Sequence, residues 1–423
     1  MNHFELKGGE LHCEDVPLAK IAEAVGTPVY VYSSATLERH FTVLRDALVG
    51  AGLKDPLIAF AVKANSNIAV LRTLANAGAG ADVVSEGEIR RALAAGVPGD
   101  RIVFSGVGKS EAEIAFALET GVSEINLESE PELHLVNKVA QRMGRRAAVA
   151  IRVNPDVEAG GHAKISTGKA ENKFGVSMAE AERLYANAAN MAGVRPVGVA
   201  CHIGSQITDL GPLEAAFRKM RALVERLRAE GLGVERLDLG GGLGVPYFNQ
   251  PTPPEPSEYA AMIARVMGGM TDLQFAFEPG RMIAANAGVL VSRILHVNAR
   301  PEGRKFLVLD AAMNDLLRPA MYDAYHDIRP LKPRDGEPVV YDVVGPICET
   351  GDTFTRDRSL PPLVAGDLVA FMTAGAYGAA MSSEYNSRLL APEVLVKGSE
   401  YAVVRPRPSY DDMLARERAA PWL

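Results

Sequence analysis

The chain has 423 residues, of which 48% are hydrophobic and 23% are charged, and its formal net charge is −7. This composition is typical of a globular protein. The length exceeds one ordinary hydrophobic core, so we expect a large domain with a smaller one, or two similar domains. The negative charge argues against nucleic acid as a partner, because nucleic acid favours a basic protein surface.

The cysteines and the first residues indicate the compartment. Cys13, Cys201 and Cys348 are far apart and odd in number, which is the pattern of neither a disulfide framework nor a zinc-binding CxxC pair. The N-terminal residues lack the apolar core of a signal peptide, and no apolar stretch approaches the roughly 20 residues that cross a bilayer. We therefore predict a cytoplasmic protein without a membrane span.

Short apolar runs alternate with longer amphipathic segments between about residue 57 and residue 278. Continuously apolar strands separated by helices indicate a parallel sheet that is covered on both faces. Eight such units fit a (β/α)8 barrel, which typically takes roughly 250 residues; a doubly wound open sheet is the alternative. The expected strands are residues 57–62, 81–84, 101–105, 124–127, 147–153, 197–203, 236–240 and 273–278.

The pattern changes at about residue 289, where helical segments nearly vanish and short β-type runs take over. Segment 27–33 (TPVYVYS) has the same β character, so we place the N-terminal residues with this second domain. The fold class is thus α/β, with a TIM-type barrel over residues 30–285. Residues 1–29 and 286–423 would form a mainly antiparallel β-sandwich or β-barrel-like domain.

Polar and glycine residues follow several of the expected barrel strands. Active sites of such barrels lie at the carboxyl ends of the strands, so these residues are expected to meet at one rim. Each of them alone also has a structural explanation, such as a solvated lysine, a glycine turn or a core histidine. The rim residues are Lys63, Asp82, Ser85, His202, Gly204, Ser205, Gly240, Gly241, Gly242, Gly244, Glu278, Gly280 and Arg281.

The residue types at this rim favour pyridoxal phosphate. Glycines let backbone N–H groups approach a phosphate after strands seven and eight, and the GxxxxGK[ST] motif of nucleotide-binding loops is absent from the sequence. A desolvated Lys63 can form an imine. Glu278 can pair with a protonated ring nitrogen, and His202 can stack on the ring. Phosphate, imine and pyridinium partners together describe pyridoxal 5'-phosphate.

Nine segments together carry a resemblance to a known family. They are AFAVKANSN, ADVVSEGE, NKFGV, CHIGSQ, DLGGGLG, FEPGR, RPAMYDAYH, GPICETGD and GAYGAAMSSEYNSR. With them the chain resembles the fold-type III pyridoxal-phosphate decarboxylases, and among these the diaminopimelate decarboxylases, over nearly its whole length. The resemblance implies a (β/α)8 barrel, a C-terminal β domain, and a homodimer in which two subunits paired head to tail complete each active site.

The resemblance also implies a role for each matching residue. Lys63 would be the cofactor lysine, with His202 on the ring and Glu278 at the ring nitrogen. Cys348 and Glu349 would come from the partner subunit. The other cofactor contacts would be Asp82, Ser205, Gly240, Gly241, Gly242, Gly280, Arg281 and Tyr377, and the other substrate contacts Arg281, Arg318, Tyr322 and Tyr377.

The expected reaction is decarboxylation of meso-2,6-diaminopimelate to L-lysine and CO2, the last step of lysine biosynthesis. The end of this substrate that does not react carries a carboxylate, which Arg281 and Arg318 can bind in a bidentate manner, and an ammonium, for which Glu349 is the candidate. After loss of CO2, the thiol of Cys348 can protonate Cα.

Three alternatives remain open from the sequence. The first is decarboxylation of ornithine, arginine or carboxynorspermidine, which have no second amino-acid carboxylate. The second is alanine racemase, which needs acid–base groups on both faces of the cofactor, whereas only Cys348 is a credible proton donor here. The third is a non-catalytic pyridoxal-phosphate carrier or regulatory homologue.

The polar, Gly-rich segment 158–172 is long enough to act as a lid.

Overall fold

The chain divides into two compact units in a computed structural model that describes residues 2–159, 172–247 and 251–423. One unit comprises Glu38–Pro246 and Pro251–Ile283. The other comprises Met1–Leu37, Tyr247–Gln250 and Ala284–Leu423. Most of segment 158–172, the expected lid, lies outside the described residues.

Parallel strands close into a barrel in the first unit. Strand β12 pairs with β5 through Ala276 and Leu57, which completes the ring. The expectation of a (β/α)8 barrel is confirmed, and the alternative of an open doubly wound sheet is wrong, because an open sheet has no such closing pair. The described strands are β5 (Leu57–Ala61), β6 (Gly80–Val83), β7 (Ile102–Phe104), β8 (Glu124–Leu127), β9 (Ala147–Arg152), β10 (Val194–Ala200), β11 (Arg236–Asp238) and β12 (Gln274–Phe277).

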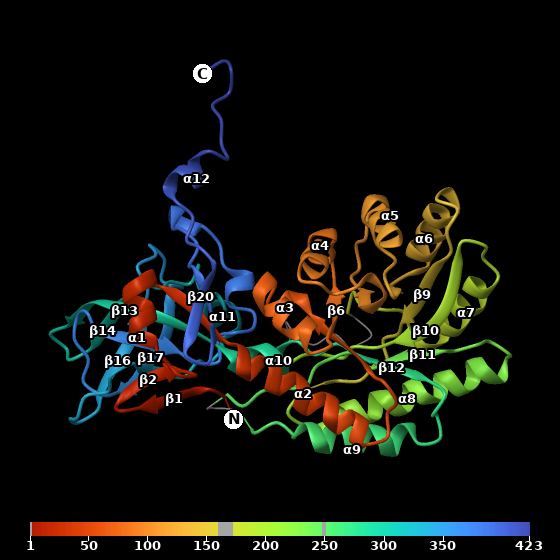
Figure 1. The fold of residues 1–423 in the computed structure, drawn as a ribbon, viewed down its shortest axis with the longest axis horizontal. Coiled ribbons are helices and arrows are strands. Elements are labelled where there is room, and N and C mark those ends of the chain that lie inside the picture. The colour runs from red at the N-terminus through yellow and green to blue at the C-terminus, as the bar shows by residue number, and fades with distance from the viewer. Residues whose placement is uncertain (1, 160–171, 248–250) are drawn as a thin grey trace. The chain divides into compact units, whose positions relative to one another are not determined.

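Helices follow the strands and surround them in chain order (Figure 1). Their ends carry local stop and start signals: Ser110 and Glu113 form a reciprocal capping box at the start of α5, and Gly121 ends this helix with a φ of 73°. The helices are α2 (Ser34–Gly50), α3 (Ile68–Asn76), α4 (Glu86–Ala94), α5 (Glu111–Thr120), α6 (Glu130–Arg142), α7 (Met178–Ala189), α8 (Leu210–Ala229), α9 (Pro256–Met267) and the short α10 (Arg281–Ala284).

A small apolar cluster identifies which side chains point into the barrel. Leu57, Val103 and Ala276 pack together although β6 lies between β5 and β7, so they meet across the interior. Side chains alternate between the two faces of a strand. Ser105, two residues after Val103, and Glu278, two residues after Ala276, therefore also face the interior at the carboxyl ends of their strands.

The second unit is built on a mixed sheet. The strand order in its described part is β17-β16-β14-β13-β4-β19-β20, and β18 adds to β13 and β15. Most neighbours are antiparallel, but β14 with β16 and β4 with β19 are parallel. The strands are β4 (Val29–Ser33), β13 (Gly288–Ala299), β14 (Lys305–Leu309), β15 (Ile328–Pro330), β16 (Val339–Val344), β17 (Thr353–Leu360), β18 (Leu368–Phe371), β19 (Glu393–Lys397) and β20 (Glu400–Arg405).

The N-terminal segment is part of this β unit, which confirms the prediction that the β domain includes the start of the chain. Strand β4 lies between β13 and β19, and it pairs with both of them. Alternate residues of β4 and of the first part of β13 enter one buried cluster, which includes Val29, Val31, Val289 and Val291. The remaining elements of the unit are β1 (Phe4–Lys7), β2 (Glu10–Cys13), β3 (Val16–Pro17), α1 (Leu18–Val25), α11 (Arg318–Tyr322) and α12 (Tyr410–Leu414).

Candidate active site

Lys63 and Asp82 form an ion pair at the carboxyl ends of two neighbouring barrel strands. Lys63 lies in a single 3-10 turn, Val62–Ala64, directly after β5, and its Nζ is 2.7 Å from Asp82 Oδ2. The Asp82 side chain is buried, while that of Lys63 is 40% exposed. Asp82 Oδ1 is buried and accepts no hydrogen bond from the part of the chain that the structure describes. A buried carboxylate with spare acceptor capacity therefore holds the lysine amine.

Glu278 directly follows β12 and lies near other carboxyl groups. Burial and the nearby Asp238 and Asp82 raise the pKa of Glu278 well above its ordinary value. Asp238 Oδ1 accepts the Gly240 N–H at 2.7 Å, and Oδ2 accepts nothing from the described residues. The Asp238 carboxyl can hydrogen-bond to that of Glu278 once one of the two is protonated. These neighbouring carboxyl groups would bind a protonated base, because its positive charge would stabilise their ionised forms.

Two short polar side chains support Glu278. The Ser105 hydroxyl donates to Glu278 Oε1 at 3.2 Å, and the Asn126 amide donates to Ser105 Oγ at 3.1 Å. Asn126 is buried in β8, so the relay is fixed by the barrel wall. This arrangement orients the Glu278 carboxyl group through Oε1.

His202 follows β10 and is held in one tautomer. Its Nδ1 accepts the Gly241 N–H at 3.2 Å, which assigns the ring proton to Nε2. Burial and the positive charges of Arg152 and Lys63 lower the pKa of His202 well below its ordinary value. The imidazole is therefore neutral at physiological pH and suited to stack on a ring.

The glycines after β11 allow three loops to come close together. A Cβ on Gly241 would lie 2.2 Å from the Glu278 carbonyl oxygen, and one on Gly242 would lie 2.7 Å from the Gly204 carbonyl oxygen. Gly240 and Gly242 also have φ values of 65° and 117°, which glycine adopts without strain. These positions bring bare backbone to the rim, as a phosphate cradle requires.

Arg281 and Ser205 complete the described rim of the barrel. Arg281 follows Gly280 at the start of α10, and its guanidinium donates to Ser205 Oγ from Nε at 3.2 Å and from Nη2 at 3.1 Å. The structure therefore gathers the barrel residues expected at the site at one end of this unit. Ser85, also expected at the rim, has a structural role, because its hydroxyl accepts the Glu88 N–H at the start of α4.

In the β unit, Arg318 is a buried and firmly held cation. It begins α11, and Nη1 lies 2.9 Å from His326 Nε2. His326 Nδ1 lies 2.9 Å from the Met372 carbonyl oxygen, so Nδ1 donates there and Nε2 is the acceptor for Arg318. The guanidinium also lies 5.2 Å from the centre of the Tyr247 ring. Tyr322 ends the same helix and is half-buried.

Cys348 and Glu349 lie on the loop between β16 and β17, and both are exposed. The Cys348 N–H donates to Asn386 Oδ1 at 3.3 Å, and the Tyr385 hydroxyl donates to Glu349 Oε2 at 3.0 Å. Tyr377 is half-buried and has a φ of 56°, which is unusual for a bulky residue. The roles of these residues toward a substrate stay predictions.

Several supporting residues were missed from the sequence. Ser105 had a usable signal, because it is the polar residue at the carboxyl end of the expected strand 101–105. His326 and Tyr247 had none, since their contacts with Arg318 depend on the folded β unit. Arg152, which ends β9, pairs with Glu128 at 2.7 Å.

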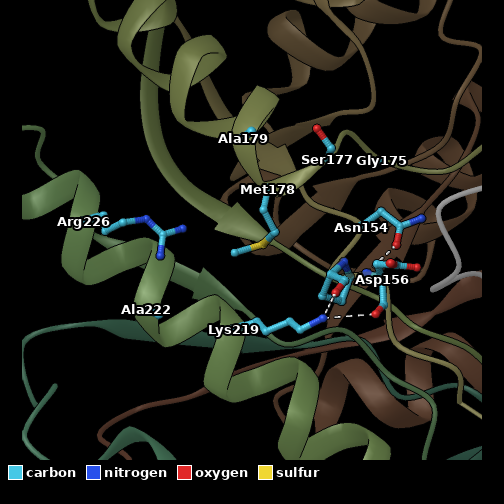
Figure 2. Close-up of a pocket in the computed structure, with 10 residues that line it drawn as sticks. Asn154, Asp156, Gly175, Ser177, Met178, Ala179, Lys219, Ala222 and Arg226 are labelled. Carbon is cyan, nitrogen blue, oxygen red and sulfur yellow. Dashed lines mark hydrogen bonds between the residues drawn. The ribbon is translucent and has the colours of Figure 1, made fainter.

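A surface pocket of the barrel unit lies apart from the expected site residues. It has a volume of about 550 Å³ and none of its lining residues was expected at the site. Figure 2 shows Lys219 donating to backbone carbonyl oxygens, those of Pro155 at 2.7 Å and Asp156 at 3.1 Å. Further lining residues are Asn154, Gly175, Ser177, Met178, Ala179, Ala222 and Arg226.

The sequence and the fold are similar to those of known proteins. A family model described as "Pyridoxal-dependent decarboxylase, pyridoxal binding domain" matches residues 34–285. A diaminopimelate decarboxylase of Zymomonas mobilis is 49% identical over 421 residues, which is 99% of this chain and 99% of that protein.

Two solved structures extend this similarity to the fold. Diaminopimelate decarboxylase of M. jannaschii, in co-complex with L-lysine, has a TM-score of 0.95 and 37% identity, and the match covers 100% of both chains. The Helicobacter pylori enzyme, complexed with L-lysine, has a TM-score of 0.90 and 40% identity over 94% of this chain and 98% of that chain. This chain therefore belongs to the pyridoxal-dependent decarboxylase family, and within it to the diaminopimelate decarboxylases.

Proposed function

We propose that this chain decarboxylates meso-2,6-diaminopimelate to L-lysine and CO2, with pyridoxal 5'-phosphate as its cofactor. The observation that carries the proposal is the meeting of the Lys63–Asp82 ion pair with the electron-rich Glu278 group at one end of the barrel. The 49% identity to a diaminopimelate decarboxylase over almost the whole chain supports this substrate.

The residues of the barrel rim fit the cofactor. When bound, pyridoxal phosphate supplies an electron-accepting ring that stabilises the charge released as CO2 leaves. Lys63 would hold the cofactor covalently through Nζ. Burial and the neighbouring Asp238 and Asp82 raise the pKa of Glu278, so a positive partner such as a protonated ring nitrogen would stabilise its ionised form. Neutral His202 would lie against the ring face, and Gly240–Gly242 with Gly280 and Arg281 would bind the phosphate.

Burial of the Asp82 carboxylate strengthens its ion pair with Lys63, compared with a pair in which both groups are in water. Asp82 would keep Lys63 oriented, since its buried carboxylate is 2.7 Å from the amine. Ser105 and Asn126 would keep one oxygen of Glu278 directed at the ring nitrogen.

The distal end of the substrate would be held by fixed charges. Arg318 is buried and oriented by His326 and Tyr247, so its guanidinium would bind a carboxylate with little loss of side-chain freedom. Arg281 and Tyr322 would assist it, and Tyr377 would lie near the phosphate and substrate. The Glu349 carboxylate, which accepts the Tyr385 hydroxyl, would bind the distal ammonium.

Cys348 would protonate Cα after CO2 has left. Its exposure at the surface of the β unit suits a donor that enters the site of another subunit. We propose that the chain works as a homodimer in which Cys348 and Glu349 of the partner subunit complete each site. We also propose a cytoplasmic enzyme without a nucleic-acid partner; none of the described helices is long and apolar enough to cross a membrane.

The test combines a spectrum with product analysis. Purified protein is reconstituted with pyridoxal phosphate, its visible absorbance is recorded, and CO2 and lysine are measured after addition of meso-diaminopimelate. We expect a visible band that Lys63→Ala removes, and equal amounts of lysine and CO2. Faster CO2 release from ornithine or arginine, or conversion of L-alanine to D-alanine, would replace the proposed reaction by one of its alternatives. A bound cofactor without any turnover would indicate a carrier.

A further inference from the structure

The loop that carries Cys348 and Glu349 is closed by the side chain of Asp352. Asp352 Oδ2 accepts the Ile347 N–H at 2.7 Å, inside the loop. Oδ1 accepts the Met313 N–H at 2.7 Å, from the segment that leads into α11. The side chain is only 3% exposed. One buried carboxylate therefore joins the Cys348 loop to the segment before Arg318.

The backbone of this loop is arranged around that carboxylate. Gly345 N–H donates to the Asp352 carbonyl oxygen at 3.1 Å, and Asp352 N–H donates to the Glu349 carbonyl oxygen at 3.0 Å. A Cβ on Gly345 would lie 2.4 Å from Asp352 Oδ2, so any larger residue would displace the carboxylate. The loop thus has a defined shape although Cys348 and Glu349 are exposed.

A strained turn holds the outer side of the same loop. Asn386 and Ser387 have φ values of 56° and 54°, which cost energy for residues other than glycine. This turn directs Asn386 Oδ1 to the Cys348 N–H at 3.3 Å and the Tyr385 hydroxyl to Glu349 Oε2 at 3.0 Å. The loop is therefore fixed from two sides, by Asp352 inside and by the turn outside.

Only a carboxylate can make both inner contacts. Ile347 and Met313 each present a backbone N–H donor, so both oxygens of residue 352 must be acceptors. An asparagine would keep one acceptor and turn an NH2 donor against the other N–H. Burial raises the pKa of Asp352 above its ordinary value, although the two backbone donors and the Arg388 charge partly offset this rise.

We propose that Asp352 is a positioning residue that sets the place of the Cys348 thiol and the Glu349 carboxylate by tying their loop to the segment before Arg318. The proposal rests on the proposed function for the roles of Cys348 and Glu349. It adds that proton delivery and recognition of the distal ammonium depend on one buried carboxylate that touches neither substrate nor cofactor.

Asp342 offers a matched control in the same unit. It is 5% exposed, its Oδ1 accepts the Asp357 N–H at 2.9 Å, and its Oδ2 is 3.6 Å from Arg304. Asp342→Asn therefore removes a buried carboxylate that accepts a backbone N–H, but its partners are not part of the Cys348 loop. A merely structural effect would be shared by Asp342→Asn and Asp352→Asn.

The first experiment measures steady-state kinetics of the holoenzyme and its variants. We expect Asp352→Asn to lower kcat about 10- to 100-fold and to raise KM for meso-diaminopimelate, because small displacements of reacting groups are costly. Cofactor affinity of Asp352→Asn should stay within about twofold of the wild type, and Asp342→Asn should change neither kcat nor KM by more than about twofold.

In a Cys348→Ala background, Asp352→Asn should cause less than about a threefold further loss of kcat, because the two residues act in one unit. If the kcat losses of Cys348→Ala and Asp352→Asn multiply in the double variant, the proposal is wrong. It is also wrong if Asp342→Asn loses as much kcat as Asp352→Asn.

The second experiment follows the thiol without any substrate. Cys13 and Cys201 are buried and Cys348 is exposed, so iodoacetamide should label Cys348 in the folded protein. We expect Asp352→Asn to change the labelling rate about fivefold or more, since the loop loses an inner contact. Asp342→Asn should leave the rate unchanged. An unchanged rate in Asp352→Asn, with normal kcat, would refute the role of Asp352.

These two experiments separate the inference from the proposed function. If the wild-type protein releases no CO2 from meso-diaminopimelate but the labelling rate responds to Asp352→Asn, the function fails and the loop inference stands. If turnover is normal in the wild type and in Asp352→Asn, and the labelling rate is the same in both, the loop inference fails and the proposed function stands. Should Asp352→Asn fail to fold, Gly345→Ala displaces the same carboxylate and is expected to give the same kinetic and labelling changes.

Discussion

The Ser105 hydroxyl and the Glu278 carboxylate meet at 3.2 Å across the barrel interior, although 173 residues separate them in the chain. Ser105→Ala removes this donor. We expect kcat to fall about 3- to 10-fold, which corresponds to one hydrogen bond of about 1 kcal/mol, with little change in KM. The kinetics of Ser123→Ala provide the control, because Ser123 binds Arg236 and not Glu278. Equal kinetics for Ser105→Ala and wild type would show that Glu278 does not need this support.

Arg318 gives the clearest test of substrate recognition. Arg318→Lys keeps the charge but loses the planar fork that binds a carboxylate through two N–H groups. We expect KM for meso-diaminopimelate to rise about 10- to 100-fold, with cofactor affinity unchanged. Steady-state kinetics and a cofactor titration measure the two effects. A KM within twofold of wild type would exclude Arg318 from the substrate site.

The buried carboxyl group of Asp238, near Glu278, predicts a pH effect on the stability of the apoprotein. Burial, Glu124 and Asp82 raise the pKa of Asp238 from 3.8 to about 7. A raised pKa means that the folded state binds the proton more tightly, so the free energy of unfolding falls as pH rises from about 4 to about 7. The loss attributable to Asp238 is at most about 4 kcal/mol. Asp238→Asn should reduce this loss, so its melting temperature should change less between pH 5 and pH 8.

Thermal unfolding of apoprotein at several pH values measures this effect. Asp272→Asn is a suitable control, because Asp272 is an exposed carboxylate whose pKa is lowered by Arg228. It should retain the pH dependence of the wild type. A steeper fall of melting temperature with pH in Asp238→Asn would reverse the assigned sign.

The buried Lys109–Glu132 pair predicts a large loss of stability. Lys109 Nζ donates to Glu132 Oε1 at 2.8 Å and to the carbonyl oxygens of Gly106 and Asn126. Lys109→Met would leave Glu132 buried without its cation, and we expect a loss of about 3–5 kcal/mol in the free energy of unfolding. Denaturant titrations of Lys109→Met and of Lys109→Met with Glu132→Leu test this. The double variant should recover part of the loss; if it is less stable than the single variant, desolvated charge is not the cause.

Much of the barrel could be predicted because its strands are buried on both faces. Such strands are continuous apolar runs, and the residues that follow them reach one rim, as Lys63, His202 and Glu278 do. Strands β17 and β20 could not be predicted in this way. They lie at the two ends of their sheet and carry many exposed side chains, so they lack an apolar run.

The supporting contacts of the site were harder to predict than its chemically distinctive residues. A lysine or a glycine triplet after an apolar strand stands out, but Asp352 is one carboxylate among 52 acidic residues. Its importance depends on two backbone N–H groups, one of them 39 residues away, and sequence patterns do not reveal such distances. The same is true of His326, which is fixed by the carbonyl oxygen of Met372, 46 positions further along the chain.

The place of β4 between β13 and β19 has a consequence for synthesis on the ribosome. This buried, apolar strand is made before the barrel, yet its partners begin only at Gly288 and Glu393. During elongation the barrel sequence is therefore completed while β4 still has two unpaired edges. Such a strand can pair with other nascent chains. We expect folding yield in a cell to depend on how well β4 is shielded until the last strands emerge.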